Sequence, residues 1–303
     1  MANIRRLVPA LLVLAMSVAA PAAADPGILL LAHGGSPEWN ARVAALAAQV
    51  DRTRPTEVAF GMATRANIQA AVNRLVARGV TEIVAVPLFV SSWSSVITST
   101  EYLLGVRLEP PAALAAYAKM NHAHADPGTT DGHHGHASED GTTPVRSTVP
   151  IRMTPALNDH PIVADILASR ARAISQKPAE EAVVIVAHGP NEDEDNRRWL
   201  ADIGSLAARI RSAGSFASVD YLTLRDDAPK PVRDEATAEL RGIVQKHSEQ
   251  GRRVLVVPLL VSFGGIDRGL RERLQGLSYA MPDAALMPDD RLVTWALAMA
   301  EKR

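Results

Sequence analysis

Two short apolar runs decide the fold: Gly27-Ile28-Leu29-Leu30-Leu31-Ala32-His33-Gly34 and Ala182-Val183-Val184-Ile185-Val186-Ala187-His188-Gly189. Runs this short and this apolar, bounded by Gly or Pro, suit central parallel strands that helices cover on both faces. Because both runs end in the same dipeptide, we interpret them as two copies of one element.

The same order of signals follows each run: a helix, a short strand, a second helix and an apolar strand that contains Val-Pro-Leu. This last strand covers 83–90 in the first copy and 254–261 in the second, and a further strand is predicted at 149–153. Apolar residues recur at a spacing near 3.6 in six stretches, which predicts helices at 39–52, 67–78, 162–174, 197–211, 236–247 and 291–302. Strands that alternate with helices predict an α/β protein with parallel sheets.

A polar joint that contains a proline, at 176–179, precedes the second His-Gly strand. We therefore divide the chain into an N-terminal half, 25–177, and a C-terminal half, 178–303. The second copy is longer between its histidine and its Val-Pro-Leu proline, so we expect an insertion near 226–233 and in the helix before its second strand.

The first 24 residues are typical of a secretory signal peptide. They comprise a basic pair at Arg5-Arg6, an apolar stretch at 7–20 and small residues before Asp25. The apolar stretch is short for a bilayer span, so we expect cleavage, with a retained membrane anchor as the alternative. The mature protein is then exported to the periplasm or secreted, with no membrane span.

The composition excludes several kinds of protein. The chain has no cysteine, which excludes disulfides, thiolate nucleophiles and thiolate metal sites. Lys and Arg number 32 against 33 Asp and Glu, so no nucleic-acid partner is expected. Neither G-x-G-x-x-G nor a P-loop follows an opening strand, and no G-x-S-x-G elbow accompanies the segment 33–36. A nucleotide cofactor and a serine hydrolase are therefore not expected, and the partners should be small molecules.

Histidine at the end of both opening strands is the main candidate for chemistry. Ligands of open parallel sheets bind at the carboxyl ends of the strands, where His33 and His188 stand. The glycine beside each histidine permits a close turn and leaves room for a ligand against the backbone. One such histidine could simply end a strand, but two at equivalent positions favour a site.

The segment 121–145 contains few large apolar residues, and we expect an exposed loop there. It supplies five of the nine histidines: His122, His124, His133, His134 and His136. Histidines flanked by glycine are a compositional signal of metal binding, and Co²⁺, Ni²⁺ or Zn²⁺ would suit them. A solubilising low-complexity insert is the alternative.

Several of these segments together resemble the class II chelatase family, which includes the sirohydrochlorin cobaltochelatases and ferrochelatases. The resemblance covers nearly the whole mature chain and depends on the combination of 31–36, 186–189, the paired Val-Pro-Leu strands, 101–105 and 149–157. It implies two tandem Rossmann- or flavodoxin-like halves with an active-site cleft between them. It also implies a lyase that inserts a divalent metal, Co²⁺ first and Fe²⁺ or Ni²⁺ next, into a sirohydrochlorin-like tetrapyrrole without ATP.

The resemblance also implies roles for particular residues. His33 matches the family's catalytic histidine, and His188 is its counterpart in the second half. We expect His33 to take a proton from the ring or hold the incoming metal ion, with His188 assisting. Residues Gly34, Gly35 and Ser36 would lie against the substrate. We expect Arg65 and Arg225, which follow corresponding strands, to meet substrate carboxylates, with a salt bridge as the alternative.

The chain departs from the family pattern at three places. Active relatives carry another histidine in the turn after the Val-Pro-Leu strand, where this chain has Trp93, and the comparable turn at 262–266, which ends at Ile266, has none. A carboxylate often ends the second strand of relatives, where this chain reads 62–64 as Met-Ala-Thr. These departures support an alternative function, a non-catalytic periplasmic protein that binds metal or tetrapyrrole on a chelatase fold.

Overall fold

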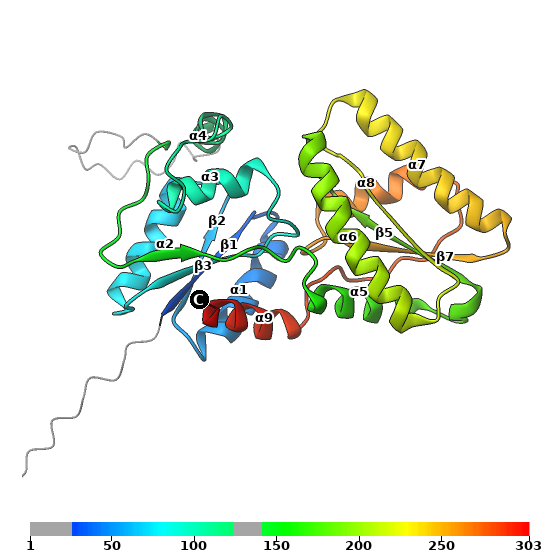
Figure 1. Ribbon diagram of the computed structural model, residues 1–303, viewed down its shortest axis with the longest axis horizontal. Coiled ribbons are helices and arrows are strands. Elements are labelled where there is room, and N and C mark those ends of the chain that lie inside the picture. The colour runs from blue at the N-terminus through cyan, green and yellow to red at the C-terminus, as the bar shows by residue number, and fades with distance from the viewer. Residues whose placement is uncertain (1–25, 124–140, 303) are drawn as a thin grey trace, which may run out of the picture.

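The computed structural model describes residues 26–123 and 141–302. The predicted signal peptide, 1–24, lies outside these residues. Within them, the structure is an α/β protein with two parallel sheets, one from each half of the chain, as the alternating pattern predicts (Figure 1).

The sheet of the N-terminal half has the strand order β2-β1-β3-β4, and every neighbouring pair is parallel. Its central strand β1 is buried along its whole length, which explains the continuous apolar run. The strands are β1 Gly27–Ala32, β2 Thr56–Phe60, β3 Ile83–Pro87 and β4 Ile151–Met153. The helices of this segment are α1 Pro37–Asp51, α2 Arg65–Ala77, α3 Ser95–Leu103 and α4 Leu114–Ala123.

The second sheet has the order β6-β5-β7, again all parallel. Ala280 forms an isolated parallel bridge with Leu255 of β7, in the place that β4 occupies beside β3. The strands are β5 Glu181–Ala187, β6 Ser218–Thr223 and β7 Arg253–Leu259. The helices are α5 Pro161–Ile174, η1 Pro178–Glu180, α6 Asp193–Gly214, α7 Lys230–Glu249, α8 Gly265–Arg273 and α9 Arg291–Glu301.

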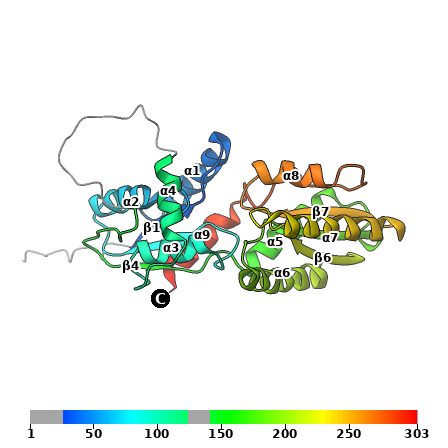
Figure 2. The same cartoon turned by 90° about the horizontal axis from the view of Figure 1, so that it is seen from above.

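Two helices exchange sides between the halves. Helix α5 precedes the predicted boundary in sequence but packs against α6 and β7 of the second half. Helix α9, at the end of the chain, packs against α1 and β3 of the first half (Figures 1 and 2). One hydrophobic cluster consequently runs through both halves, and each sheet carries a second cluster on its other face. The spatial grouping of the helices thus differs from the division of the sequence between 177 and 178.

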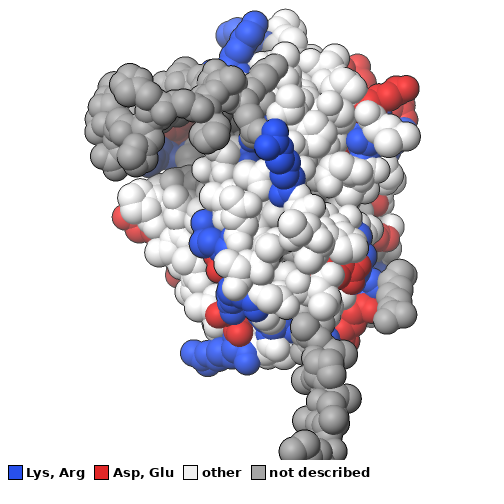
Figure 3. Space-filling model, turned by 90° about the vertical axis from the view of Figure 1, so that its left-hand side faces the viewer, with Lys and Arg blue, Asp and Glu red and all other residues white. Residues whose placement is uncertain are grey.

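The surface of the N-terminal half mixes charges of both signs. Figure 3 shows Lys and Arg interspersed with Asp and Glu over the described part of this face. Some of them pair between neighbouring elements, as Arg74 with Glu57 at 2.6 Å and Arg78 with Asp51 at 2.6 Å. Across 26–123 and 141–302, none of the helices is both long and apolar enough to cross a bilayer.

Candidate functional site

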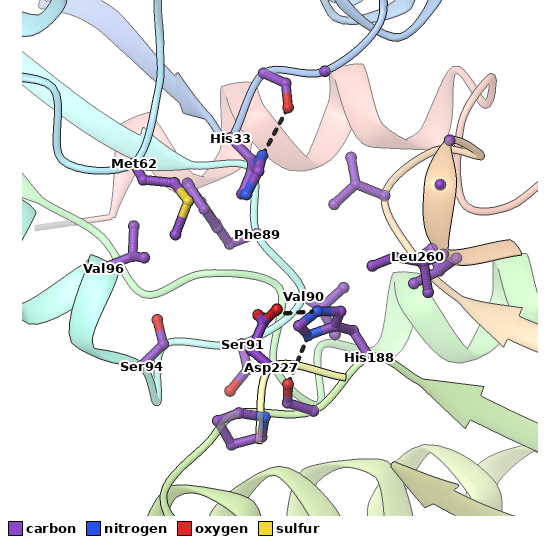
Figure 4. Close-up of a pocket in the computed structure, with 18 of the residues that line it drawn as sticks. His33, Met62, Phe89, Val90, Ser91, Ser94, Val96, His188, Asp227 and Leu260 are labelled. Carbon is purple, nitrogen blue, oxygen red and sulfur yellow. Dashed lines mark hydrogen bonds and ion pairs between the residues drawn. The ribbon is translucent and has the colours of Figure 1, made fainter. Parts of the chain in front are cut away.

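A cavity of about 910 Å³ lies at the carboxyl ends of the strands, between the two halves (Figure 4). This is where parallel sheets bind ligands, and the volume is at the upper end of small-molecule sites. The N-terminal half contributes His33, Trp39 and Phe89 among others, and the C-terminal half contributes His188, Trp199 and Asp227. The wall is mostly apolar, with few polar groups that converge.

His33 follows β1 and points into the cavity from the N-terminal half (Figure 4). Its Nδ1 lies 2.7 Å from the carbonyl oxygen of Gly34, whose φ of 83° folds the chain back beneath the ring. A carbonyl oxygen can only accept, so Nδ1 carries the proton in the neutral imidazole. Nε2 of His33 is then left with a free lone pair, available to a proton or a metal ion.

His188 repeats this geometry after β5, on the opposite wall. Its Nδ1 lies 2.6 Å from the carbonyl oxygen of Gly189, which has a φ of 78°. Its Nε2, however, lies 3.3 Å from Oδ2 of Asp227. Both ring nitrogens therefore face acceptors, an arrangement that favours the imidazolium over the neutral ring.

The pKa values of this pair agree with the geometry. Burial acts most strongly on His188 and lowers its pKa, but the hydrogen bond and charge of Asp227, with the charge of Asp226 and the carbonyl of Gly189, outweigh burial, and the pKa is raised. The hydrogen bond from His188 likewise lowers the pKa of Asp227, helped by the charges of both cavity histidines. The two histidines share a backbone motif and differ in their surroundings, because Asp227 lies beside Nε2 of His188.

Asp227 is the site residue that reading the sequence missed. It lies just after β6, the second strand of the C-terminal half, within the segment 226–233 that the sequence marks as an insertion. The carboxylate expected after the second strand of the first half is absent there, but one follows the second strand of the second half. Applying the same expectation to both copies would have found it.

The predicted substrate-binding segment does line the cavity: Gly34, Gly35 and Ser36 all contribute to it. Their polar groups also shape the turn. The amide of Gly35 donates to Oδ1 of Asn40 at 2.9 Å, and Ser36 caps α1 by accepting from the amide of Trp39 at 3.3 Å. The local sequence thus fixes the backbone beside His33.

Neither Arg65 nor Arg225 lines the cavity, so their contact with substrate carboxylates stays a prediction. Arg65 is 8% exposed, and its Nε donates to the carbonyl oxygen of Thr143 at 2.8 Å. Arg225 is also 8% exposed and donates from Nε to the carbonyl oxygen of Pro190 at 2.7 Å. Their guanidinium donors secure loop carbonyls, and Arg225 in this way supports the turn after His188. Arg225 also forms an ion pair with Asp193 at 2.9 Å, in line with the alternative of a salt bridge. Arg268 of α8 is an arginine that does line the cavity.

The histidines of the segment 121–145 cannot be placed in the site. His124, His133, His134 and His136 lie outside the described residues, and His122 belongs to α4 with its side chain outside the description. Among 26–123 and 141–302, no three His, Asp or Glu side chains are grouped so that they could hold a metal ion. Metal binding by these five histidines stays a prediction.

Four helices begin at the cavity, a consequence of the parallel topology. The cavity lining includes the first residues or caps of these helices: Ser36 for α1, Ser94 and Ser95 for α3, Glu192 for α6, and Gly264 and Gly265 for α8. The amide groups at helix N-termini favour anions. Such an edge suits the carboxylates of an acidic ligand without help from Arg65 or Arg225.

Comparisons with known proteins agree with this architecture. Residues 27–174 match the family model of CbiX. No curated protein matches the sequence. Among solved structures, SirB from Bacillus subtilis with Fe³⁺ is similar, with a TM-score of 0.56, 16% identity, and coverage of 91% of this chain and 94% of that one.

Two further structures share the fold. The sirohydrochlorin chelatase SirB from Bacillus subtilis subspecies spizizenii, in complex with cobalt, has a TM-score of 0.54, 16% identity, and coverage of 91% of this chain and 94% of that one. DR2241 from Deinococcus radiodurans, described as a multi-domain protein with structural similarity to chelatases and two additional domains, has a TM-score of 0.50 at 16% identity. The match covers 92% of this chain but 56% of that longer one. The match of residues 27–174 to the CbiX model, together with the fold shared with SirB, supports the assignment to the class II chelatase family.

Proposed function

We propose that this protein inserts a divalent metal ion into a sirohydrochlorin-like tetrapyrrole, as a lyase that needs no nucleotide. The observation that carries the proposal is His33, whose Nε2 is free in a cavity of about 910 Å³ that has the His188–Asp227 pair on its other wall. Co²⁺ is the first candidate metal, with Fe²⁺ or Ni²⁺ next, because all three accept imidazole ligands.

The chemistry requires a group that can accept a proton. A tetrapyrrole loses two pyrrole N–H protons as the divalent ion enters, so the charge of the ring system is unchanged by the exchange. Neutral His33 is suited to accept such a proton or to hold the incoming ion at Nε2. His188 has no free nitrogen lone pair in its protonated state, so its role is to orient Asp227.

Asp227 supplies negative charge on the wall opposite His33. Its side chain is 66% exposed, which leaves the carboxylate accessible from the cavity. Glu38, Glu192 and Asp195 line the same cavity. Together these carboxylates attract a hydrated divalent cation to the place where the ring would lie.

The proposal is tested by mixing the mature chain, 25–303, with sirohydrochlorin and Co²⁺ under anaerobic conditions and following the absorbance change of metal insertion. We expect a rate above the spontaneous one, and a loss of about 10²-fold in H33A if the imidazole acts as a general base. A variant without 121–145 serves as the control for metal held by that segment. An unchanged rate in H33A would contradict the role of His33.

A second candidate is a non-catalytic protein that binds metal or tetrapyrrole. It is favoured by Met62 and Trp93, which stand where the resemblance expects a carboxylate and a histidine. Absence of acceleration with Co²⁺, Ni²⁺ and Fe²⁺, together with metal uptake that disappears with residues 121–145, would establish this candidate.

We also propose an extracytoplasmic location, supported by the signal-like sequence of 1–24. Recovery of the protein from the periplasm with a new N-terminus near Asp25 would support it. Retention of the full-length chain in the cytoplasm would contradict it.

A further inference from the structure

Trp93 lies in the turn between β3 and α3, but its side chain leaves the cavity and reaches α6 of the other half. Its indole Nε1 donates to Oδ2 of Asp202 at 3.1 Å. The guanidinium carbon of Arg198 lies 4.8 Å from the centre of the ring, within the range of a cation–π contact. The side chain that replaces the family's turn histidine thus contacts the opposite half.

The backbone of Trp93 makes a second contact with the same helix. Its carbonyl oxygen accepts from the indole Nε1 of Trp199 at 2.7 Å. Trp199 is 8% exposed and lines the cavity. A buried indole N–H needs a partner, and here that partner belongs to the other half.

A matching contact holds the equivalent turn of the C-terminal half. Arg42 of α1 donates to the hydroxyl of Ser262, which is 5% exposed, at 2.9 Å. A Cβ atom added to Gly264 would lie 3.8 Å from the ring of Trp39. The turn after β7 is therefore held by α1, as the turn after β3 is held by α6.

The two helices use the same positions for these contacts. A shift of 160 residues aligns buried positions of α1 with buried positions of α6, namely Trp39 with Trp199, Val43 with Ile203, Leu46 with Leu206 and Val50 with Ile210. The same shift aligns Arg42 with Asp202, the residues that hold the opposite turns. Both contacts are thus consequences of the internal repeat.

We propose that Trp93 is a positioning residue of the site. With Arg198, Trp199 and Asp202 it forms an interlobe clasp that sets the separation between the cavity wall of His33 and the wall of His188. The chain crosses between the halves in two segments, 154–160 and 281–290, and linked domains of this kind can change their angle. The clasp restricts that motion beside the cavity, because the turn of Trp93 contributes Ser91, Ser94 and Ser95 to its wall.

The clasp is tested by hydrogen–deuterium exchange on the full mature chain without ligand, so the result does not depend on the proposed function. In W93A we expect amide exchange about tenfold faster in both 91–97 and the first turns of α6, because each segment loses its partner. W93F keeps an aromatic ring beside Arg198 but loses the donor to Asp202, so its exchange should lie between those of W93A and the natural chain. The backbone carbonyl beside Trp199 is kept in both variants. Unchanged exchange in α6 of W93A would overturn the proposal.

Arg197→Ala is the matched control, since Arg197 neighbours Arg198 on α6 but pairs with Glu194 of its own helix. We expect R197A to exchange like the natural chain and R198A to exchange faster at 91–97. Equal exchange in the two variants would overturn the cation–π part of the clasp.

The activity arm of the test rests on the proposed function. W93H restores the residue type of the relatives, but position 93 faces α6, so we expect metal insertion to fall as it does in W93A. A KM for the tetrapyrrole that rises more than kcat falls is the expected signature of a wall that has lost its position. Faster insertion in W93H would overturn the proposal, because it would place residue 93 in the cavity.

Discussion

The two cavity histidines show how one local motif is placed in two electrostatic surroundings. His-Gly after a buried strand fixes the ring in both halves, because the glycine adopts a positive φ and its carbonyl oxygen accepts from Nδ1. The local sequence therefore sets the tautomer. The pKa depends on a tertiary partner, and Asp227 is that partner for His188.

Replacement of Asp227 by Asn should lower the pKa of His188. In the natural chain the pKa is raised above its ordinary value of 6.5, although burial, the largest single influence, lowers it. D227N removes the charge of Asp227, the main influence that opposes burial, so the pKa should fall below that of the natural chain. Histidine NMR titration of both proteins measures it, and an unchanged pKa would mean that Asp227 does not pair with His188 in solution.

The same pair predicts a pH window of stability. A raised His188 pKa contributes stability fully below its unfolded value of 6.5, and this contribution is lost as the pH rises through the folded pKa. A lowered Asp227 pKa contributes fully above its unfolded value of 3.8 and is lost as the pH falls through the folded pKa. The free energy of unfolding of D227N should therefore differ most from that of the natural chain at pH values between the two unfolded pKa values, 3.8 and 6.5. Urea unfolding at pH 5 and pH 9 tests this, and a larger difference at pH 9 would contradict it.

At the scale of elements, the turns after β1 and β5 depend on glycine. Gly189 has a φ of 78°, and a Cβ placed there would meet the Cβ of Thr223 at 2.6 Å. Gly251, in the same half, has a φ of 73° but open space around it. Substitution by alanine at both positions therefore separates the free-energy cost of a left-handed backbone from the cost of a steric clash.

G189A should therefore destabilise the protein more than G251A. The left-handed conformation costs a residue with a side chain about 1–2 kcal/mol at either position. At Gly189 the contact with Thr223 adds about 1–3 kcal/mol of overpacking. Urea unfolding measures both variants, and equal losses would show that the turn after β5 can move away from Thr223.

The regular elements were largely predictable from the sequence, because their signals are local. The predicted helix 162–174 is α5, and the predicted strand 83–90 begins where β3 begins. Helices α3, α4 and α8 were not predicted. Helix α8 buries only Leu270, so its sequence shows almost no helical periodicity of apolar residues. His247, in the last turn of α7, is 4% exposed and hydrogen-bonded to Asp220, a burial that the position at a helix end does not indicate.

The position of the candidate site could be predicted from side chains that follow strand ends. The partners of these side chains could not be predicted where they lie far along the chain. His33 and His188 reach one cavity because both end central strands. Arg65 and Arg225 also follow strands, but burial turned their side chains towards loop carbonyls. Which donors remain free for a ligand is decided by packing between segments, and a single sequence does not show that packing.

At the scale of the whole molecule, the exchange of α5 and α9 was beyond the sequence. An amphipathic helix shows that one face is buried but not which sheet covers it. Helix α9 buries large side chains against the first half, among them Leu292, Trp295 and Met299. Burial of each of these side chains contributes about 1.5–3 kcal/mol to the free energy of unfolding. Helix α9 thus contributes an amount comparable with the total stability of an ordinary domain.

Each half should therefore be unable to fold stably alone. A fragment of 26–177 lacks α9 and leaves the apolar face of α5, with Val163, Ile166 and Leu167, without its partner in the second half. We expect no cooperative thermal unfolding by circular dichroism from this fragment, and none from 178–302. Mixed in equal amounts, the fragments should regain a cooperative transition, because each supplies the helix that the other lacks. A fragment of 26–177 that unfolds cooperatively at the midpoint of the whole chain would show that the exchanged helices are dispensable and that the two halves are independent domains.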